Sequence, residues 1–280
     1  MNNTKTKIIK VSGKNIDNFF QNIITNDINN LNKNTPLYTA MLSPQGKYLH
    51  DFIMLQDNEF YLLEINKNSI ELLIKEIKKY DMRNDISVEV KNNINTKVII
   101  KENFNKNFLN KPENNKVYRD KNFICLIDPR SKDFLYRFWI NGELNDQKEF
   151  NFSDEDKIEK KRIFLKIPNS EKDLIYNKSF ILNYNFENIN SLSFNKGCYI
   201  GQENTARQKF RGTQKYSLQR IKIIDGVVPK LNEDIFYNNL KIGTMKSSYA
   251  EFCLCLIRND TIKKSTNQIT TDTNFTFKIL

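Results

Sequence analysis

The sequence predicts an α+β protein that ends in a small β-barrel, and three observations support this fold class. Residues 1–215 alternate between runs with the spacing of amphipathic helices and runs of strand-forming residues. From Tyr216 onward the chain holds only short alternating segments separated by turn residues, which is typical of a small all-β module. A chain of 280 residues is also long enough for one large domain or two modest ones. We therefore expect a body over residues 1–215 and a barrel over residues 216–280.

The expected helices lie in the body. They cover residues 16–28 (a helix and its exit), 69–80, 152–165 and 203–210. In the first of them, the apolar residues recur at intervals of three and four, which places on one helix face Ile16, Phe19, Phe20, Ile23 and Ile24. The last expected helix ends at Gly212, since glycine commonly terminates helices.

The expected strands are runs rich in β-branched and aromatic residues. They cover residues 36–42, 48–55, 59–65, 86–90, 98–100, 123–127 and 135–140 in the body, and 218–224, 235–237, 240–245, 251–257 and 274–279 in the barrel. Pro44 and Gly46 occupy turn positions, so the segment Ser43–Gly46 predicts a tight turn between the first two strands. Much of residues 91–121 is rich in Asn and Lys, which indicates a long surface loop.

Composition argues against several classes of protein. No run approaches the roughly 20 apolar residues of a membrane helix, and the N-terminus lacks the apolar region of a secretory signal. The four cysteines form no CxxC pair, and one histidine, His50, cannot complete a zinc site with them, so we expect no metal. Cys253 and Cys255 alternate in a predicted strand and are expected to be buried, whereas His50 is expected in a loop. We expect a protein of the reducing bacterial cytoplasm that does not bind membranes.

The net charge of +11 has two explanations. It indicates an anionic ligand or nucleic acid, or it reflects a composition rich in Lys, Asn and Ile, which we favour for the total. The distribution of the charge is more informative than its sum. A stretch without acidic residues, from Thr205 to Lys222, contains Arg207, Lys209, Arg211, Lys215, Arg220 and Lys222. This basic stretch overlaps and follows the most distinctive motif of the chain.

That motif runs from Lys196 to Gly212. Gly197 and Gly201 bracket Cys198 and permit backbone conformations that other residues avoid. Cys198 is expected just before a helix N-terminus, where the helix dipole and the adjacent lysine favour a thiolate.

The charged residues of the motif have helical spacing. Glu203 and Arg207 lie four residues apart, in the order that favours an ion pair on a helix, and Arg211 continues the same face. The same pattern suits a tight strand-to-helix turn with a structural cysteine and a solvated face. From the local residues alone, a reactive site and a structural turn remain equally open alternatives.

The sequence KGCYIGQENTAR, residues 196–207, closely resembles the signature of the YgfZ-type folate-binding family. The stem of that signature is K-G-C-Y/F-x-G-Q-E, followed by an arginine and then by an R-G pair, which Arg211 and Gly212 match. Other segments resemble the family in order and spacing. They are Thr25–Asp27, Leu42–Lys47 with Asp51, Lys79–Arg83, Ile167–Pro168 and Ile242–Thr244. The resemblance therefore spans nearly the whole chain.

The resemblance implies a fold similar to that of T protein, the aminomethyltransferase of the glycine cleavage system. That fold is a ring of α+β subdomains that binds tetrahydrofolate in a central channel, with a C-terminal β-barrel. The resemblance also implies an accessory factor for the assembly or repair of iron–sulfur enzymes, including those that methylthiolate tRNA. These enzymes and their assembly machinery would be its partners.

The resemblance further implies roles for individual residues. Cys198 is the reactive thiol or a contact to the folate, and Lys196 tunes it. The residues implied to contact tetrahydrofolate or a one-carbon derivative are Asn26, Asp27, Gly197, Tyr199, Gly201, Gln202, Glu203, Arg207 and Arg211. Whether the factor catalyses a transferase-like reaction stays open.

Three departures from the family pattern concern the pterin. Lys166 replaces the glycine of a G-I-P turn, and Leu182–Tyr184 replaces a P-x-E stretch. Phe164 follows Arg162 at the position where T proteins carry a pterin-binding glutamate. YgfZ-type proteins also usually lack that glutamate, so this departure argues against glycine cleavage more than against folate binding.

Two alternatives to the accessory factor remain. One is a true aminomethyltransferase of the glycine cleavage type. The other is a non-enzymatic RNA-binding module built on the basic stretch from Thr205 to Lys222. Only Phe210 and Tyr216 interleave the charges of that stretch, and RNA binding usually adds exposed stacking aromatics, so we expect no stable nucleic-acid binding.

Overall fold

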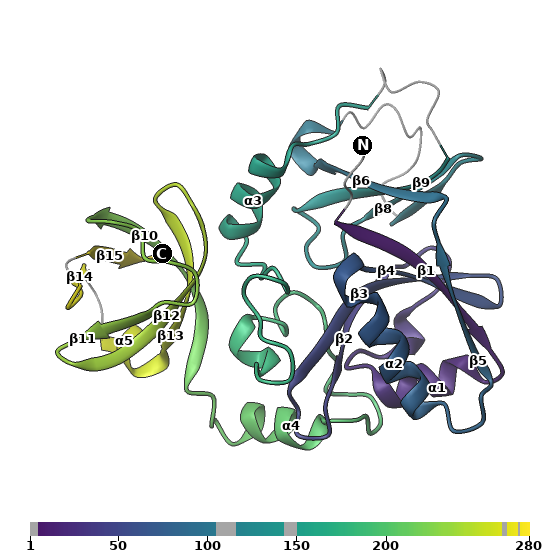
Figure 1. Ribbon diagram of the computed structural model, residues 1–280, viewed down its shortest axis with the longest axis horizontal. Helices are drawn as coiled ribbons and strands as arrows, with labels where there is room; N and C mark the ends of the chain where they lie inside the picture. The colour runs from purple at the N-terminus through teal and green to yellow at the C-terminus, as the bar shows by residue number, and fades with distance from the viewer. Residues whose placement is uncertain (1–4, 105–115, 143–149, 265–267, 274) are drawn as a thin grey trace. The chain divides into compact units, whose positions relative to one another are not determined.

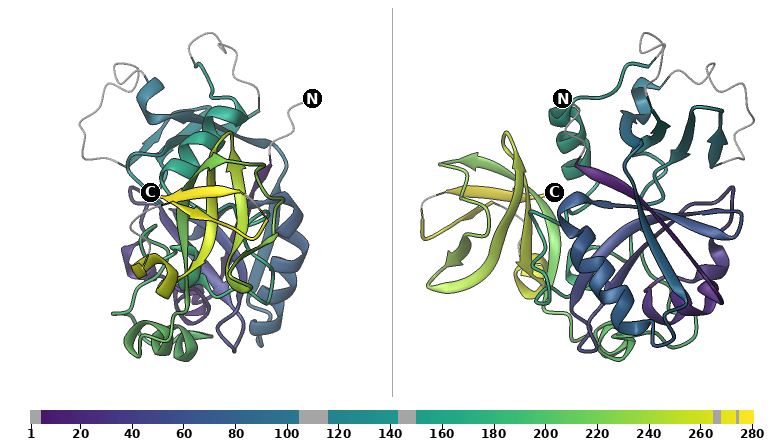
Figure 2. Two further views of the ribbon diagram at one scale, coloured as in Figure 1. Left: turned by 90° about the vertical axis from the view of Figure 1, so that its left-hand side faces the viewer. Right: turned by 45° about the vertical axis from the view of Figure 1, so that its right-hand side comes forward.

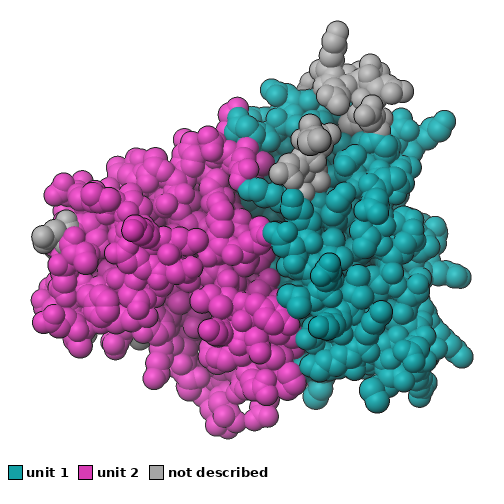
Figure 3. Space-filling model, viewed as in Figure 1, with its two compact units in different colours: residues 1–41, 50–154, 190–200 teal, residues 42–49, 155–189, 201–280 magenta. Residues whose placement is uncertain are grey.

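The computed structural model in Figure 1 describes residues 5–104, 116–142, 150–264, 268–273 and 275–280. These residues group into two compact units, shown in two colours in Figure 3. Unit 1 comprises residues 1–41, 50–154 and 190–200, and unit 2 comprises residues 42–49, 155–189 and 201–280. The expected boundary between residues 215 and 216 stays a prediction, because each unit combines segments that are distant in the sequence.

A five-stranded sheet forms the centre of unit 1. Its strand order is β2-β3-β4-β1-β5. The strands are β1 (Thr6–Gly13), β2 (Leu37–Leu42), β3 (Tyr48–Asp57), β4 (Phe60–Asn66) and β5 (Ile86–Lys91). β1 pairs antiparallel with both β4 and β5. The first strand of the chain therefore lies inside the sheet.

Two helices cover one face of this sheet, α1 (Ile16–Ile23) and α2 (Ile70–Tyr80). Their apolar faces join the buried residues of the strands in one hydrophobic core. Among its members are Ile9, Val11, Phe20, Ile23, Phe52, Met54, Leu63, Leu73 and Ile77. The spacing of three and four predicted for the first helix thus matches the residues that it buries.

A second sheet of unit 1 has the order β6-β9-β8-β7. Its strands are β6 (Ile94–Ile100), β7 (Val117–Arg119), β8 (Phe123–Ile127) and β9 (Leu135–Asn141). Short 3-10 helices accompany the sheets of unit 1: η1 (Ile28–Asn30), η2 (Lys67–Ser69) and η3 (Lys101–Asn103). Successive side chains of β9 point to opposite faces of the sheet. Phe138 and Ile140 lie in an aromatic core, while Trp139 donates a hydrogen bond of 2.7 Å to Glu64 of β4.

Unit 2 contains a six-stranded sheet that nearly closes into a barrel, in the order β11-β12-β13-β10-β15-β14. The strands are β10 (Tyr216–Asp225), β11 (Asp234–Tyr237), β12 (Leu240–Tyr249), β13 (Phe252–Arg258), β14 (Ile269–Thr270) and β15 (Thr276–Ile279). Asp272 follows β14, and its N–H donates to the carbonyl of Phe236 in β11 at 3.1 Å. The predicted α+β fold with a terminal barrel is confirmed.

The rest of unit 2 combines short helices with turns. It contains α3 (Glu155–Phe164), η5 (Ile181–Tyr184), α4 (Gln202–Phe210) and α5 (Asn259–Lys264), and Figure 2 shows the chain from two further sides. The buried carboxylate of Asp173 joins α3 to the barrel. It accepts from Arg162 at 3.1 Å, and from both the N–H and the hydroxyl of Ser247 at 2.7 and 2.6 Å.

Most predicted elements are present, and the exceptions have physical reasons. β1 was not predicted, because its lysines interrupt the apolar pattern; Lys10 lies over the ring of Phe60, 4.2 Å from its centroid. The prediction that His50 lies in a loop is wrong, since it lies in β3 and is 1% exposed. Cys253 and Cys255 are buried in β13, as predicted. Residue 274 and residues 105–115, which belong to a predicted strand and loop, lie outside the described residues.

One further finding concerns membranes. Within the described ranges, no helix is both long enough and apolar enough to cross a bilayer.

Candidate functional site

The first half of the motif lies beside the exit of α1. Residues 190–200, here called the motif loop, are joined to residues 22–27 by several hydrogen bonds. They run from Thr25 Oγ1 to Ser191 O at 2.6 Å, from Asn26 Nδ2 to Asn190 O at 2.8 Å, from Ser193 N to Thr25 O at 3.0 Å and from Ile200 N to Asn22 O at 3.0 Å. Two motifs that are far apart in the sequence thus form one structure in unit 1.

Lys196 alone makes three hydrogen bonds between these segments. Its ammonium donates to the carbonyl oxygens of Gln21, Ile24 and Asn26 at 2.7, 2.7 and 2.8 Å. Carbonyls at a helix end lack intrahelical partners and carry partial negative charge, so a cation stabilises them. Burial lowers the pKa of Lys196 to about 8, and the carboxylate of Asp27 opposes part of this shift. The side chain therefore remains mainly charged near neutral pH.

The side chains of Asn26 and Asp27 are engaged within the protein. Asn26 Nδ2 donates to Tyr38 O at 2.9 Å as well as to Asn190 O, so both of its amide hydrogens are used. Asp27 Oδ1 accepts from Gln21 Nε2 and from Asn29 N, each at 3.0 Å. Both residues hold the turn in shape, and their predicted contacts to folate stay predictions.

Gly197 and Cys198 form a short exposed arch in the motif loop. Lys196 anchors one side of the arch. On the other side Tyr199 is buried, and Ile200 packs against the core of unit 1. The expectation that Gly197 needs a special backbone is not met, because its φ lies outside the left-handed region and an added Cβ would meet open space. Cys198 is exposed, whereas Cys125, Cys253 and Cys255 are buried.

Gly201 needs glycine for two reasons. Its φ of +84° lies in the left-handed region, and an added Cβ would come within 2.5 Å of Ser43 O and 2.8 Å of Leu42 Cβ. Gly46, with φ of +73°, lies on the other side of the same contact. Asn204 Nδ2 also donates to Gln45 O at 2.9 Å. In unit 2 the tip of the β2–β3 hairpin therefore packs tightly against the start of α4.

α4 has the charges that its sequence predicts. Gln202 is its first residue, and Glu203 and Arg207 form the expected ion pair at 2.8 Å on an exposed face. Arg211 caps the helix, and Gly212 follows with φ of +62°, which confirms the predicted end.

The basic stretch does not form one patch. Lys209 pairs with Glu187, as Arg207 does with Glu203. Arg220, on β10, lies over the ring of Phe164 with 4.0 Å to its centroid and donates to the carbonyl of that residue at 2.8 Å. The cations are thus divided between α4 and the barrel wall, and several of them are already engaged.

A buried polar network in unit 1 was not predicted from the sequence. The carboxylate of Asp128 accepts from Arg130 at 2.7 and 2.9 Å and from Arg137 at 2.7 Å, and Arg137 also pairs with Glu64. Burial raises the pKa of Asp128, but the charges and hydrogen bonds of both arginines outweigh it and hold the pKa below its ordinary value. The only signal in the sequence was charged residues within or beside strand-like runs.

Near this network, Tyr38 donates from its hydroxyl to Asp51 Oδ2 at 2.7 Å. Tyr38 also contributes the carbonyl that holds Asn26, so Asp51 is connected to the turn of the motif. Burial and the Asp51 charge raise the pKa of Tyr38, so this hydroxyl stays protonated and donates. Asp51 is a partly exposed carboxylate, and its only signal in the sequence is its place in the family pattern.

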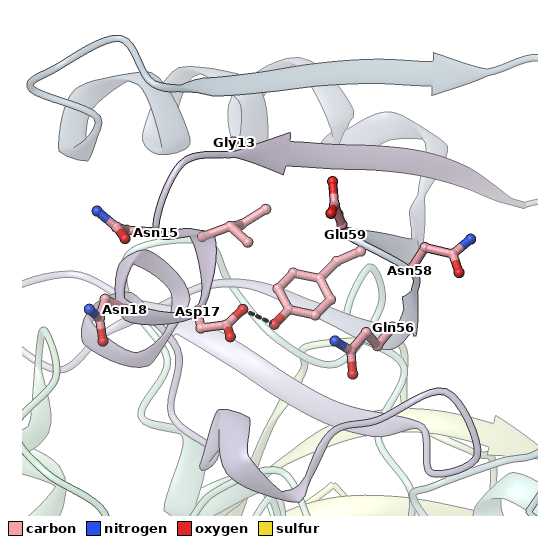
Figure 4. Close-up of a pocket in the computed structure, with 9 residues that line it drawn as sticks. Gly13, Asn15, Asp17, Asn18, Gln56, Asn58 and Glu59 are labelled. Atoms are coloured by element: carbon pink, nitrogen blue, oxygen red, sulfur yellow. Dashed lines mark hydrogen bonds between the residues drawn. The ribbon is translucent and has the colours of Figure 1, made fainter.

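Figure 4 shows a polar pocket of about 450 Å³ in unit 1, at the start of α1 and the β3–β4 turn. Asp17 accepts a hydrogen bond from the hydroxyl of Tyr61 within it. The residues that line it are Gly13, Asn15, Ile16, Asp17, Asn18, Gln56, Asn58, Glu59 and Tyr61. None of these belongs to the motif, so the pocket is not the predicted site. Among the described residues, no group of three His, Cys, Asp or Glu side chains could hold a metal ion.

Comparison with known protein families found no family model that matches this chain. Individual proteins do match. The chain is 28% identical over 261 residues to the mitochondrial iron–sulfur cluster assembly factor IBA57 homologue of Neurospora crassa, covering 82% of this chain and 55% of that protein. It is 27% identical over 237 residues to the tRNA-modifying protein YgfZ of Buchnera aphidicola, covering 81% of this chain and 74% of that protein.

The chain spans a little over half the length of the IBA57 homologues it matches. A solved structure, the glycine cleavage system aminomethyltransferase T of Bartonella henselae, matches with a TM-score of 0.73 over 99% of this chain and 83% of that protein, at 11% identity. This likeness concerns the fold alone, and it agrees with the aminomethyltransferase-like fold that the family resemblance implies.

Proposed function

We propose that this chain is a member of the YgfZ-type folate-binding family and a tetrahydrofolate-binding accessory factor for the assembly or repair of iron–sulfur enzymes, a proposal supported by its similarity to IBA57 homologues and to YgfZ. Enzymes that methylthiolate tRNA are among the proposed clients. Its partners are these enzymes and the assembly machinery that serves them. We place the factor in a reducing compartment, the bacterial cytoplasm, where an exposed thiol such as Cys198 persists unpaired.

The observation that carries the proposal is the exposed arch of Gly197 and Cys198 between two buried anchors. An exposed cysteine on an anchored loop can reach a ligand or a partner protein, whereas the three buried cysteines cannot. The thiolate is the nucleophilic form of cysteine and the form that binds iron. Cys198 is therefore the proposed reacting group, and its chemistry would act on the client or on the one-carbon unit of the folate.

The charged residues of α4 suit the glutamate tail of a folate. Guanidinium groups pair with carboxylates through two parallel hydrogen bonds. Arg211 is exposed at the end of α4, and Arg207 is 48% exposed at its side chain while paired with Glu203. A ligand carboxylate would take the place of Glu203 on Arg207. When bound, tetrahydrofolate supplies a carrier for a one-carbon unit; the protein residues bind and orient it.

The remaining motif residues are also proposed to contact the folate or to support its site. Gly201 is the N-cap of α4 and Gln202 its first residue, and main-chain N–H groups at a helix start are suited to an anion. Tyr199 is buried, and the ammonium of Lys196 lies over its ring, 5.0 Å from the centroid, so Tyr199 helps to hold Lys196 in place. Asn26 and Asp27 would act on the ligand by shaping the turn beneath the motif loop.

The experiment that tests the function combines binding with complementation. The purified protein is titrated with tetrahydrofolate and its one-carbon derivatives, and saturable binding is expected. In parallel, wild type and Cys198→Ala are expressed in a bacterial strain that lacks its YgfZ. Wild type should restore methylthiolated tRNA and resistance to oxidants, and Cys198→Ala should not. Full complementation by Cys198→Ala would refute the reacting role of Cys198, and absent folate binding would refute the accessory factor as proposed.

A true aminomethyltransferase is the second candidate, and the fold of aminomethyltransferase T favours it. The residues at the position of the pterin-binding carboxylate argue against an aminomethyltransferase. Phe164 stands where a carboxylate would contact the pterin, and the neighbouring Arg162 is buried in ion pairs with Glu159 and Asp173. In a glycine cleavage assay with the partner proteins of that system we expect no activity. Turnover there would favour the transferase.

A further inference from the structure

We infer that Lys196 is a positioning residue that acts as a tethered cation: its ammonium fills a site formed by three carbonyl oxygens at the exit of α1 and so holds the Cys198 arch in place. The three carbonyl oxygens match the three hydrogens of an ammonium group. This inference rests on the proposed function only in taking Cys198 as the reacting group.

The geometry of the ammonium supports a positioning role. An ammonium has three hydrogens to donate, and three carbonyl oxygens accept them at 2.7, 2.7 and 2.8 Å. The side chain is 8% exposed, so water cannot readily replace these acceptors. A lysine that tuned the thiol would direct its charge at the sulfur, but this charge is directed at the end of a helix.

The chemistry of the acceptors also points to a cation. The carbonyls of Gln21 and Ile24 belong to the last turn and cap of α1, where the helix dipole is negative. The carbonyl of Asn26, in the turn after the helix, is the third acceptor. The side-chain amide of Asn26 donates to the carbonyls of Tyr38 and Asn190 and so holds this turn in place. Because α1 and this turn are held by other contacts, the three oxygens should keep their places without the lysine.

The arch depends on the contacts of the Lys196 ammonium because its other anchor, Ile200, holds only the C-terminal side of the arch. Ile200 is fixed by its hydrogen bond to Asn22 O and by packing in the core of unit 1. Gly197 and Cys198 are exposed and lie between these two fixed points. Loss of the ammonium would free one end of the arch, and the thiol would sample more positions.

The test uses Lys196→Met, which keeps an apolar stem of similar length and removes the charge and the donors. We expect hydrogen exchange of the amides in residues 190–200 to become roughly tenfold faster, since a local opening becomes easier. The rate of Cys198 alkylation by iodoacetamide should change, while the midpoint of its pH–rate profile stays where it is in wild type. The three other cysteines are buried, so alkylation of the folded protein reports Cys198.

Rescue by a small amine is the decisive step. Methylammonium chloride should restore slow exchange in Lys196→Met, because it brings the missing ammonium group to the carbonyl site. Tetramethylammonium chloride at the same ionic strength should not, because it carries the charge without N–H donors. Failure of methylammonium to slow exchange in a folded variant would overturn the inference. The inference would also be overturned if Lys196→Met shifted the midpoint of the pH–rate profile of Cys198 alkylation and left amide hydrogen exchange unchanged, because Lys196 would then tune the thiol.

Lys246→Met is the matched control. Lys246 is also a buried lysine, 3% exposed, and its ammonium donates to Asn232 Oδ1 at 2.8 Å in the barrel. Its replacement should leave exchange in residues 190–200 and Cys198 alkylation unchanged, with or without methylammonium. If Lys196→Met does not fold, Lys196→Gln, which keeps two N–H donors, is measured in the same way and should show a smaller acceleration of exchange. An unchanged rate in a folded Lys196→Gln would count against the inference.

These measurements use neither folate nor an iron–sulfur client. If the carbonyl site binds methylammonium but Cys198→Ala complements fully, the reacting role proposed for Cys198 fails and the positioning of the arch stands. If methylammonium has no effect but folate binding and complementation depend on Cys198, the inference fails and the proposed function stands.

Discussion

Gly46 and Gly201 lie against each other in unit 2: a Cβ added to Gly201 would come within 3.1 Å of Gly46 Cα, and one added to Gly46 within 3.1 Å of Gly201 O. Both residues have positive φ. The hairpin tip and the start of α4 can approach this closely because neither glycine carries a side chain. The close approach fixes the point at which the chain leaves the motif loop and enters α4.

This contact predicts the effect of a single methyl group. Gly201→Ala should destabilise the protein by about 2 kcal/mol or more, because alanine adds both strain at φ of +84° and a clash with Ser43 O. Urea denaturation measures the loss of stability.

Gly197→Ala provides the matched control for that substitution. Its φ is ordinary and an added Cβ meets open space, so the free energy of unfolding should stay within about 0.5 kcal/mol of wild type. Equal losses for the two variants would contradict the close approach of Gly46 and Gly201.

The single histidine predicts a pH dependence of stability. Burial lowers the pKa of His50 to about 4, which the carboxylates of Asp51 and Glu76 only partly oppose. Between the ordinary value of about 6.5 and this lowered value, the unfolded chain binds a proton that the folded protein does not. Stability from this group is therefore complete above about pH 6.5 and falls as the pH drops towards 4, by roughly 3 kcal/mol in all.

Comparison with a variant isolates this contribution from the acidic groups. His50→Gln cannot titrate, so its stability should fall less between pH 6.5 and 4 than that of wild type, as measured by urea denaturation at each pH. Since the chain has one histidine, its NMR titration in the folded protein can be assigned directly. A midpoint near 6.5 would contradict the burial of His50 in β3.

The ion network of unit 1 predicts a large stability effect. Asp128→Asn keeps the shape of the side chain but leaves Arg130 and Arg137 without their shared carboxylate. Loss of one partner from a buried pair costs about 3 kcal/mol or more. The exposed pair of Lys101 and Asp133 is the control, and Lys101→Ala should cost less than about 1 kcal/mol. Similar costs for the two variants in thermal or urea denaturation would show that the network is solvated.

The proposed folate contact predicts a difference between two neighbouring cations. Arg211→Ala should weaken the binding of tetrahydrofolate about tenfold, because one charge-assisted hydrogen-bond pair is lost. Lys215→Ala removes an exposed charge from the same segment and should leave the affinity nearly unchanged. Isothermal titration with a polyglutamylated and a monoglutamylated folate measures both. An unaltered affinity in Arg211→Ala would remove this residue from the site.

The local elements of this protein were largely predictable from its sequence. The spacing of Ile16, Phe20 and Ile23 predicts α1, and the turn at Ser43–Gly46 predicts its hairpin; both depend on neighbours in the chain. β1 escaped prediction because its lysines interrupt the apolar pattern, and its place inside the sheet depends on β4 and β5, which are distant in the sequence. The same holds for Arg137 of β9, whose partner Glu64 lies in β4, 73 positions earlier.

Some features of the motif follow from its sequence, and others depend on the tertiary structure. Residues 196–212 carry the most specific part of the family resemblance. They also predicted the ion pair of Glu203 and Arg207 and the end of α4 at Gly212, because both features depend on contacts within a few residues. The tertiary structure decided what Lys196 does. Its nearest candidate partner in the sequence was Cys198, but its acceptors lie 170 to 175 positions earlier, at the end of a helix. A buried ammonium goes where three acceptors converge, and only the folded chain brings them together.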